Sequence, residues 1–201
     1  MKELLKRAAF GVATLGVVPS LLSFFLRAQL IGRDRAIEGS TQALGLVPGL
    51  TGQYLRRAFL ARTLASCHWT ATVEFGTLFS SAAARLDEHV YVGPRCHLGL
   101  VHLERDVLIG AGVHIPSGAA THGTDESSRP IREQVRPKTL VTVGAGAWIG
   151  SGAIVMADVG HDSVVGAGSV VTRPVPPLVM AVGDPARVVR ERGPADGRPD
   201  A

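Results

Sequence analysis

One histidine stands where a regular sequence pattern breaks off, and its position suggests chemistry. His122 opens a polar stretch, HGTDESSRPIREQVRPKTLVT, that interrupts a repeating aliphatic pattern between Thr121 and Val143. Long structureless segments are uncommon inside a compact domain and are usually functional. Imidazole has an unperturbed pKa of about 6.5, so a histidine can take the proton of an alcohol that attacks a carbonyl near neutral pH. We predict that His122 is a general base, although a histidine taken alone is more often an ordinary surface or core residue.

Acids in the same stretch could orient the imidazole of His122. A histidine base works better when a carboxylate or a carbonyl holds its second ring nitrogen. Asp125 and Glu133 are the candidates for this role. Each of them could equally be a solvated acid on a loop.

The sequence does not indicate a covalent intermediate. It contains no G-x-S-x-G segment, the turn that exposes a nucleophilic serine. Cys67 and Cys96 each precede a histidine, but neither pair has the C-x-x-C or H-x-x-x-H spacing that brings two side chains onto one metal ion. Two cysteines also cannot form a disulfide framework, which fits a reducing compartment. We expect small buried thiols, direct transfer between two substrates, and no metal.

A period of six residues runs through both blocks around His122. Each repeat starts with an aliphatic residue, usually followed by glycine, and has a small or β-branched fifth residue, as in Ile109-Gly-Ala-Gly-Val-His. The aliphatic residue would point into a narrow interior, and glycine would let the chain turn at a corner. Stacked coils bury a continuous core, which a single coil cannot do. We predict an all-β solenoid with irregular corners at residues 98–103 and 155–159, where the period shortens to five and four residues.

The composition agrees with a solenoid. The 201 residues include 24 glycines and only 5% aromatic residues, and a helical glycine costs about 1 kcal/mol relative to alanine, which disfavours a helical bundle. The formal charge is +4, and no basic run alternates with aromatic residues, so we expect no nucleic-acid partner. The positive excess suits an anionic ligand or an anionic membrane surface.

The first third of the chain has the composition of a membrane attachment. Residues 8–26 contain no charge, and basic residues flank them about equally on both sides. About 20 apolar residues suffice to cross a bilayer, but Pro19 could bend the segment into a shallow hairpin or an interfacial helix. Because a single span would carry Lys2, Lys6 and Arg7 across the membrane, we expect a monotopic or re-entrant anchor with a cytoplasmic N-terminus. A buried apolar helix packed on the rest of the protein is the alternative.

Residues 42–64 follow with apolar positions at helical spacing. Arg56, Arg57 and Arg62 lie among these positions. Such a basic amphipathic helix could lie on an anionic leaflet. It could instead cap the open end of the solenoid, which any solenoid needs.

The six-residue period resembles that of the hexapeptide-repeat acyltransferases, a family that includes maltose, galactoside and colanic-acid-type O-acetyltransferases. The resemblance covers residues 73–192 and is most specific at 148–151, 165–173 and 182–190 taken together. It implies a left-handed parallel β-helix, an exception to the usual right-handed crossover. It also implies a homotrimer with active sites between subunits, an acyl-CoA donor, expected to be acetyl-CoA, and a catalytic histidine at the loop entrance, here His122.

The resemblance also assigns a binding site for the donor. Small residues would contact the pantetheine arm mainly through the backbone, and arginines would face the phosphates of CoA. The residues in question are Trp148, Ser151, Ala167, Thr172, Arg173, Arg187 and Arg190. The alternative is that the small residues pack corners and the arginines are solvated. Related sugar acetyltransferases carry a loop glutamate near the position of Glu133, so Glu133 is the first candidate partner of His122 and Asp125 the second.

Two other functions fit parts of the pattern. A gamma-class carbonic anhydrase shares this fold and gathers three histidines on one zinc ion between subunits. His97 and His102 resemble its closely spaced pair, whereas His68 fits the third position only approximately, and that class lacks a long loop opened by a catalytic histidine. A non-catalytic scaffold is the other alternative, and an intact His122 speaks against it.

The predicted organisation has four parts: a membrane-associating segment at 1–35, an amphipathic helical linker or cap at 36–68, a β-helix at 69–192 with an active-site loop at 122–142, and a disordered tail at 193–201. Because acyl-CoA is a cytoplasmic metabolite, we expect the protein at the cytoplasmic face of the inner membrane. The acceptor would be a hydroxyl of a sugar, a polysaccharide or a lipid-linked glycan, and the residues do not specify which.

Overall fold

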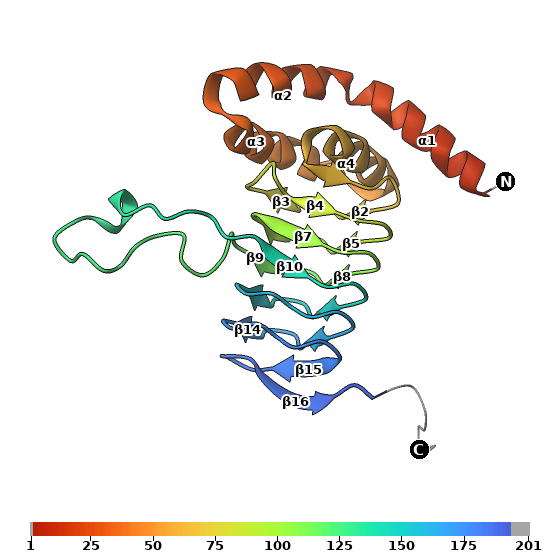
Figure 1. Ribbon diagram of the computed structural model, residues 1–201. Coiled ribbons are helices and arrows are strands. Elements are labelled where there is room, and N and C mark those ends of the chain that lie inside the picture. The colour runs from red at the N-terminus through yellow and green to blue at the C-terminus, as the bar shows by residue number, and fades with distance from the viewer. Residues whose placement is uncertain (1, 194–201) are drawn as a thin grey trace.

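A computed structural model describes residues 2–193, which form a triangular solenoid beneath a helical cap (Figure 1). The predicted tail at 193–201 lies outside the described residues except for Gly193. The solenoid has three faces of parallel strands, here called sheets A, B and C. The predicted parallel β-helix with an N-terminal helical segment is confirmed.

Each turn of the solenoid contributes a short strand to each sheet. Sheet A contains β1 (Ser66–Cys67), β4 (Arg85–Leu86), β7 (Val101–Leu103) and β10 (Val141–Val143). Sheet B contains β2 (Thr72–Val73), β5 (Tyr91–Val92), β8 (Leu108–Ile109), β11 (Trp148–Ile149), β13 (Val164–Val165), β15 (Val179–Val182) and the antiparallel β16 (Arg187–Glu191). Sheet C contains β3 (Leu78–Phe79), β6 (His97–Leu98), β9 (His114–Ile115), β12 (Ile154–Val155) and β14 (Val170–Val171). The third coil is therefore β7–β8–β9, and the fourth is β10–β11–β12.

The aliphatic residues that begin the repeats line the interior, as the period predicts. In sheet B, Ile109 pairs with Val92 on one side and with Ile149 on the other, so like residues stack along the solenoid. The shortened spacing at 155–159 is also accommodated, because Val159 bridges Val143 and Val175 and takes the sheet A position of its coil. The inward residues with no exposed surface include Leu86, Val92, Leu98, Leu103, Ile109, Ile115, Val143, Ile149, Val155, Val165 and Val171.

Glycines at the corners allow the coils to stack closely. A Cβ added to Gly150 would lie 2.4 Å from the backbone nitrogen of Ala167 in the next coil, and one added to Gly110 would lie 2.6 Å from that of Ser151. Both distances are too short for real carbon atoms, so a side chain at either position would push the coils apart. This explains why glycine recurs at the second position of the repeat.

Two helices close the end of the solenoid above the first coil. They are α3 (Arg33–Gly45) and α4 (Gly49–Thr63), and Pro48 separates them at the break that the sequence contains. α4 contacts β1 and β2, and α3 contacts β3. Residues 42–64, for which a cap was the alternative to a helix on a leaflet, thus belong to two helices that cover the end of the solenoid. The first strand begins at Ser66, three residues before the expected boundary of 69.

The sequence analysis expected Arg56 and Arg57 to face an anionic leaflet from an amphipathic helix, and the structure shows that this was wrong. Both are buried. The Arg56 guanidinium donates hydrogen bonds to the backbone oxygens of Val47 at 2.7 Å, Val73 at 2.9 Å and Leu44 at 3.1 Å. It thereby joins α4, the end of α3 and the first coil of the β-helix.

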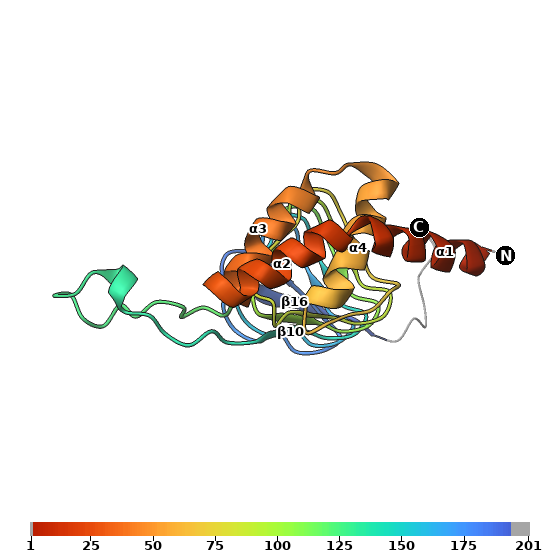
Figure 2. The same cartoon turned by 90° about the horizontal axis from the view of Figure 1, so that it is seen from above.

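The apolar N-terminal segment forms a second layer over this cap. It consists of α1 (Lys2–Gly16) and α2 (Val18–Ile31), which lie across the end of the solenoid (Figures 1 and 2). Pro19 falls in the first turn of α2, where proline is tolerated. Of the helices in residues 2–193, none by itself is long and apolar enough to cross a membrane, but Lys6–Gly16 and Val18–Ile31, bent by 54°, meet the length and composition together.

The bonds of Arg56 give a prediction about stability. Arg56→Met would keep the apolar part of the side chain but remove three hydrogen bonds, and the backbone oxygens of Val47 and Val73 would lose this donor, whereas that of Leu44 would keep the backbone nitrogen of Val47. We expect this to lower the free energy of unfolding by about 2–4 kcal/mol, as measured by urea denaturation followed by circular dichroism. The control is Arg35→Met, an exposed residue of α3 whose replacement should change stability by less than about 0.5 kcal/mol. Equal stability of the two variants would contradict the structural role of Arg56.

Candidate active site

A long loop leaves the solenoid between the third and fourth coils. Residues 116–140 connect β9 to β10 and project beyond one corner of the solenoid in both views (Figures 1 and 2). β10 pairs in register with β7, Val141 opposite Val101, so the fourth coil stacks on the third despite the insertion. At the base, the backbone nitrogen of Thr139 donates to the oxygen of Ser117 at 2.9 Å. The two arms of the loop therefore leave and return side by side.

His122 lies at the neck of this loop. It forms an antiparallel bridge with Val135. Next to it, the backbone nitrogen of Gly123 donates to the oxygen of Gln134 at 2.5 Å, and that of Arg136 donates to the oxygen of Thr121 at 3.2 Å. These bonds fix the backbone of His122, while its side chain is exposed. Among residues 2–193, its imidazole has no hydrogen bond and no ion pair.

The two candidate acids lie farther out on the loop, and each contacts an arginine. Asp125 forms an ion pair with Arg136. Glu133, in a 3-10 turn at Ile131–Glu133, lies 3.8 Å from the guanidinium of Arg132. Neither acid contacts His122 within this chain, so the proposed orientation of the imidazole by either acid stays a prediction.

Gln134 and Lys138 organise the loop, and the sequence analysis did not single them out. The side-chain amide of Gln134 donates to the backbone oxygens of Glu126 at 2.7 Å and Arg129 at 2.9 Å, which closes the outer part of the loop. The ammonium of Lys138 lies 2.5 Å from the carboxylate of Asp34, which ties the base of the loop to α3. Burial opposes ionisation of Asp34, but its bonds with Lys138 and the backbone nitrogen of Ala82 outweigh this and lower its pKa.

A cavity of about 370 Å³ lies beside the base of the loop. Thr121 and Lys138 line it from the loop, and His97 and His114 line it from sheet C. The rings of these two histidines are edge to face, with centroids 5.8 Å apart. The cavity therefore places polar side chains of sheet C near the neck that carries His122. His114 could have been noticed in the sequence, because it holds the same place in its repeat as His97.

The residues predicted to bind the donor fall into two groups in one protomer. Ser151 and Ala167 occupy equivalent positions at the corner between sheets B and C, and Trp148 lies on the outer surface of sheet B just before this corner. Arg173 follows β14 at the next corner and lines a cavity of about 180 Å³ together with Arg187. Thr172 precedes Arg173, and Arg190 lies on β16. All seven side chains are exposed and available to a ligand.

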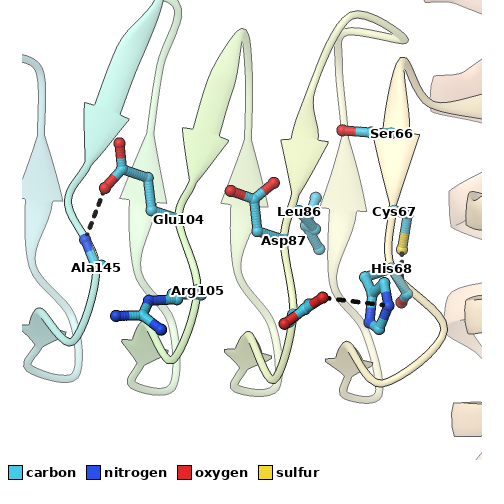
Figure 3. Close-up of a pocket in the computed structure, with 9 residues that line it drawn as sticks. Ser66, Cys67, His68, Leu86, Asp87, Glu104, Arg105 and Ala145 are labelled. Carbon is cyan, nitrogen blue, oxygen red and sulfur yellow. Dashed lines mark hydrogen bonds and ion pairs between the residues drawn. The ribbon is translucent and has the colours of Figure 1, made fainter.

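A second cavity, of about 630 Å³, lies on the other side of the solenoid, where the strands of sheet A end (Figure 3). His68 faces Glu88 across it at 3.8 Å, and Glu104 accepts a hydrogen bond from the backbone nitrogen of Ala145 at 2.9 Å. The neighbouring His102 is bound to Asp87 at 3.0 Å. Since His97 is on sheet C, the three histidines of the carbonic anhydrase alternative lie on two different faces of one chain. Within residues 2–193 no three histidine, cysteine or acidic side chains are placed to hold a metal ion.

Comparison with known proteins agrees with the repeat. Residues 140–173 match the family model described as the hexapeptide repeat of succinyl-transferase. The resemblance to the hexapeptide-repeat acetyltransferases is confirmed. The galactoside O-acetyltransferase of Escherichia coli K12 is 49% identical over 53 residues, which are 25% of this chain and 26% of that protein. A putative acetyltransferase of Saccharomyces cerevisiae is 34% identical over 113 residues, 51% of this chain and 56% of that protein. The chain thus spans between about a quarter and about half of the length of these hexapeptide-repeat relatives.

Solved structures of hexapeptide-repeat proteins share the fold over most of the chain. A galactoside acetyltransferase in complex with coenzyme A has a TM-score of 0.63 at 24% identity, covering 80% of this chain and 81% of that chain. A maltose O-acetyltransferase from Clostridium difficile 630 has a TM-score of 0.64 at 21% identity, covering 83% and 89%. At this level of identity the likeness establishes the fold.

The state of the cysteines gives a prediction about reactivity. Burial raises the pKa of Cys67 to about 12, against a smaller opposing effect of Arg57, and burial also raises the pKa of Cys96. The thiolate is the reactive form, and very little of it is present well below the pKa. We expect iodoacetamide at mildly alkaline pH to leave Cys67 unmodified in the folded protein, whereas both cysteines react in urea, as followed by mass spectrometry. Rapid labelling of Cys67 in the folded protein would show that its thiol is accessible and ionised.

Proposed function

We propose that the chain is an acyl-CoA-dependent O-acyltransferase that uses acetyl-CoA and a hydroxyl of a sugar, a polysaccharide or a lipid-linked glycan. The observation that carries the proposal is His122, whose backbone is fixed and whose imidazole is unengaged at the neck of the loop of a hexapeptide-repeat β-helix. The similarity to galactoside and maltose O-acetyltransferases, one of them in complex with coenzyme A, supports both the reaction and the donor.

The proposed reaction is a direct transfer. A ring nitrogen of His122 takes the proton of the acceptor hydroxyl as its oxygen attacks the thioester carbonyl. The carbon–sulfur bond then breaks, the acyl group stays on the acceptor oxygen, and the proton passes from the imidazolium to the sulfur of CoA. No enzyme nucleophile is required, which fits the raised thiol pKa of both Cys67 and Cys96. Glu133 or Asp125 would stabilise the imidazolium after exchanging its present arginine partner.

We place the site between subunits of a homotrimer. The loop of one protomer projects away from its own coils (Figure 1), and it exposes two apolar side chains, Val135 at the neck and Ile131 farther out. A neighbouring subunit would cover these side chains and bring its own donor-binding residues next to His122. Ser151, Ala167 and Thr172 would then contact the pantetheine arm beside Trp148, and Arg173, Arg187 and Arg190 would face the phosphates of CoA.

We further propose that the enzyme works at the cytoplasmic face of the inner membrane. Acyl-CoA is made and used in the cytoplasm, so the site has to be on that side. The uncharged residues 8–26 supply the contact with the membrane. A glycan or its lipid-linked precursor is an acceptor that can be found there.

The assignment of the base is tested by His122→Ala. We expect acyl transfer to fall by roughly 100-fold to 10,000-fold, while the dissociation constant of CoA stays nearly unchanged, because the variant loses proton transfer and keeps the donor site. His161→Ala is the matched control, since His161 is also exposed but pairs with Asp162 at a corner of the solenoid. Near-normal transfer by purified His122→Ala protein would rule out His122 as the base.

The shared site is tested by mixing inactive subunits. His122→Ala and Arg173→Gln/Arg187→Gln chains should each give a nearly inactive trimer. Co-expressed, they should form mixed trimers that regain activity, because some clefts combine an intact His122 from one subunit with intact arginines from the other. Mixed trimers that stay as inactive as their parents would place the whole site within one protomer. A fully active monomer in mild detergent would contradict the requirement for a trimer.

A further inference from the structure

Residues 8–26 of helices α1 and α2 carry no charge, and apolar side chains lie on both faces of these helices, which is unusual for the outermost layer of a protein. A surface helix normally presents polar residues to water, and a helix that is apolar all round is covered on all sides. We infer that the outward face of α1 and α2 lies in the plane of the cytoplasmic leaflet, where lipid covers it. This deepens the membrane location proposed above, and its test does not depend on catalysis.

The inward face of the two helices is packed on the cap. Ala13, Val17 and Phe24 are buried. The ring of Phe24 meets that of Phe59 in α4 edge to face at 5.8 Å. Phe10, Leu21 and Ala28 are partly buried against the same core and continue this face at helical spacing. The cap therefore accounts for one side of α1 and α2 only.

The opposite side is apolar and exposed. It carries the outer apolar face, a set of side chains that are 42–78% exposed: Leu4, Val12, Leu15, Val18, Leu22, Phe25, Leu26, Leu30 and Ile31. Between Ala8 and Leu26 no charged residue interrupts this face. Apolar surfaces that extend over two helices mark sites of contact with a protein or a membrane.

Basic residues at both ends of the outer apolar face favour an anionic lipid surface as the occupant. Residues 2–7 contain two lysines and one arginine against one glutamate, and residues 27–35 contain three arginines against one aspartate. That aspartate, Asp34, is engaged by Lys138 and by the backbone of Ala82. Amphipathic helices with such flanks bind anionic leaflets, through apolar burial and charge attraction together. A second copy of the same face would instead bring like charges together, because a twofold contact pairs each surface with itself.

The contacts of the inward face favour an in-plane arrangement over a span. A guanidinium nitrogen of Arg27 donates to the hydroxyl of Ser40 at 2.8 Å, and one of Arg33 donates to the backbone oxygen of Thr63 at 2.8 Å. The guanidinium of Arg7 lies over the ring of Trp69, 5.1 Å from its centroid. Crossing a bilayer would break these contacts and expose Phe24, whereas lying on the leaflet keeps all of them.

Binding to vesicles tests this surface directly. The full chain is floated with vesicles of phosphatidylcholine, with or without phosphatidylglycerol. We expect it to bind the anionic vesicles more tightly than the neutral ones, and more weakly at high salt. Leu22→Glu/Leu26→Glu should reduce partitioning by at least ~100-fold, because two exposed leucines lose their contact with lipid and two acids face anionic headgroups.

The control is Val189→Glu, the same type of change at one exposed apolar residue on β16, at the far end of the solenoid. It should bind vesicles like the unchanged protein. CoA binding and circular dichroism of Leu22→Glu/Leu26→Glu should be normal, because both leucines are exposed. Failure of the unchanged protein to bind either kind of vesicle, or equal binding by Leu22→Glu/Leu26→Glu, would overturn the inference. The inference would also be overturned if the unchanged protein formed an assembly larger than a trimer without lipid and Leu22→Glu/Leu26→Glu reduced this assembly to trimers. The outer apolar face would then contact other copies of the protein.

Labelling with an impermeant maleimide distinguishes the in-plane arrangement from a span. Glu3→Cys protein bound to the outside of sealed vesicles should be labelled above the level of the unchanged protein, because an in-plane segment keeps its N-terminal end on the side of addition. Labelling that requires permeabilised vesicles would mean that α1 and α2 cross the bilayer, and would overturn the in-plane arrangement.

Discussion

The stacking of inward aliphatic residues is the constraint on which the rest of this structure depends. A strand of two or three residues has too few bonds to stand alone, so each is held by the coils above and below it. The coil that follows the long loop must therefore stack in register on the coil that precedes it, with Val141 opposite Val101. That requirement brings both arms of the loop together at one corner. His122 is consequently placed at a narrow neck, although the residues beyond it have no repeating pattern.

The helical cap connects the first coil of the solenoid to the N-terminal helices α1 and α2. Arg56 joins the first coil to both cap helices, and Phe59 and Phe24 join the cap to α2. If the outer apolar face lies on a leaflet, the solenoid stands away from the membrane, with the loop projecting sideways from its third coil. With neighbouring strands about 4.8 Å apart, the third coil lies roughly 10–15 Å from the capped end. An acceptor attached to the same membrane would then need to extend past the cap to reach His122.

The sequence alone predicts the features that depend on periodicity. Position one of the repeat predicts Ile109, Ile149 and Val165 as core residues, and the shortened spacing before Val159 predicts an irregular corner. The spacing of residue types was less informative about side chains that are buried against backbone groups far away in the sequence. Helical spacing shows that Arg56 and Arg57 share a helix with apolar residues, but only the folded chain brings the oxygens of Val47 and Val73 to Arg56. The partners of the loop acids, and the contact of Lys138 with Asp34, likewise join residues whose proximity no period encodes.

The central claim is that His122 takes the proton of the acceptor in a cleft that two subunits form. The most direct measurement is a structure of the assembled protein with coenzyme A and a glycan acceptor. The account predicts a ring nitrogen of His122 about 3 Å from the acceptor hydroxyl, with the thiol of coenzyme A on the other side of that hydroxyl, along the coils of the neighbouring subunit. A complex in which the hydroxyl and the thiol meet beyond the reach of His122, more than about 4 Å from its ring and with no bridging water, would contradict it.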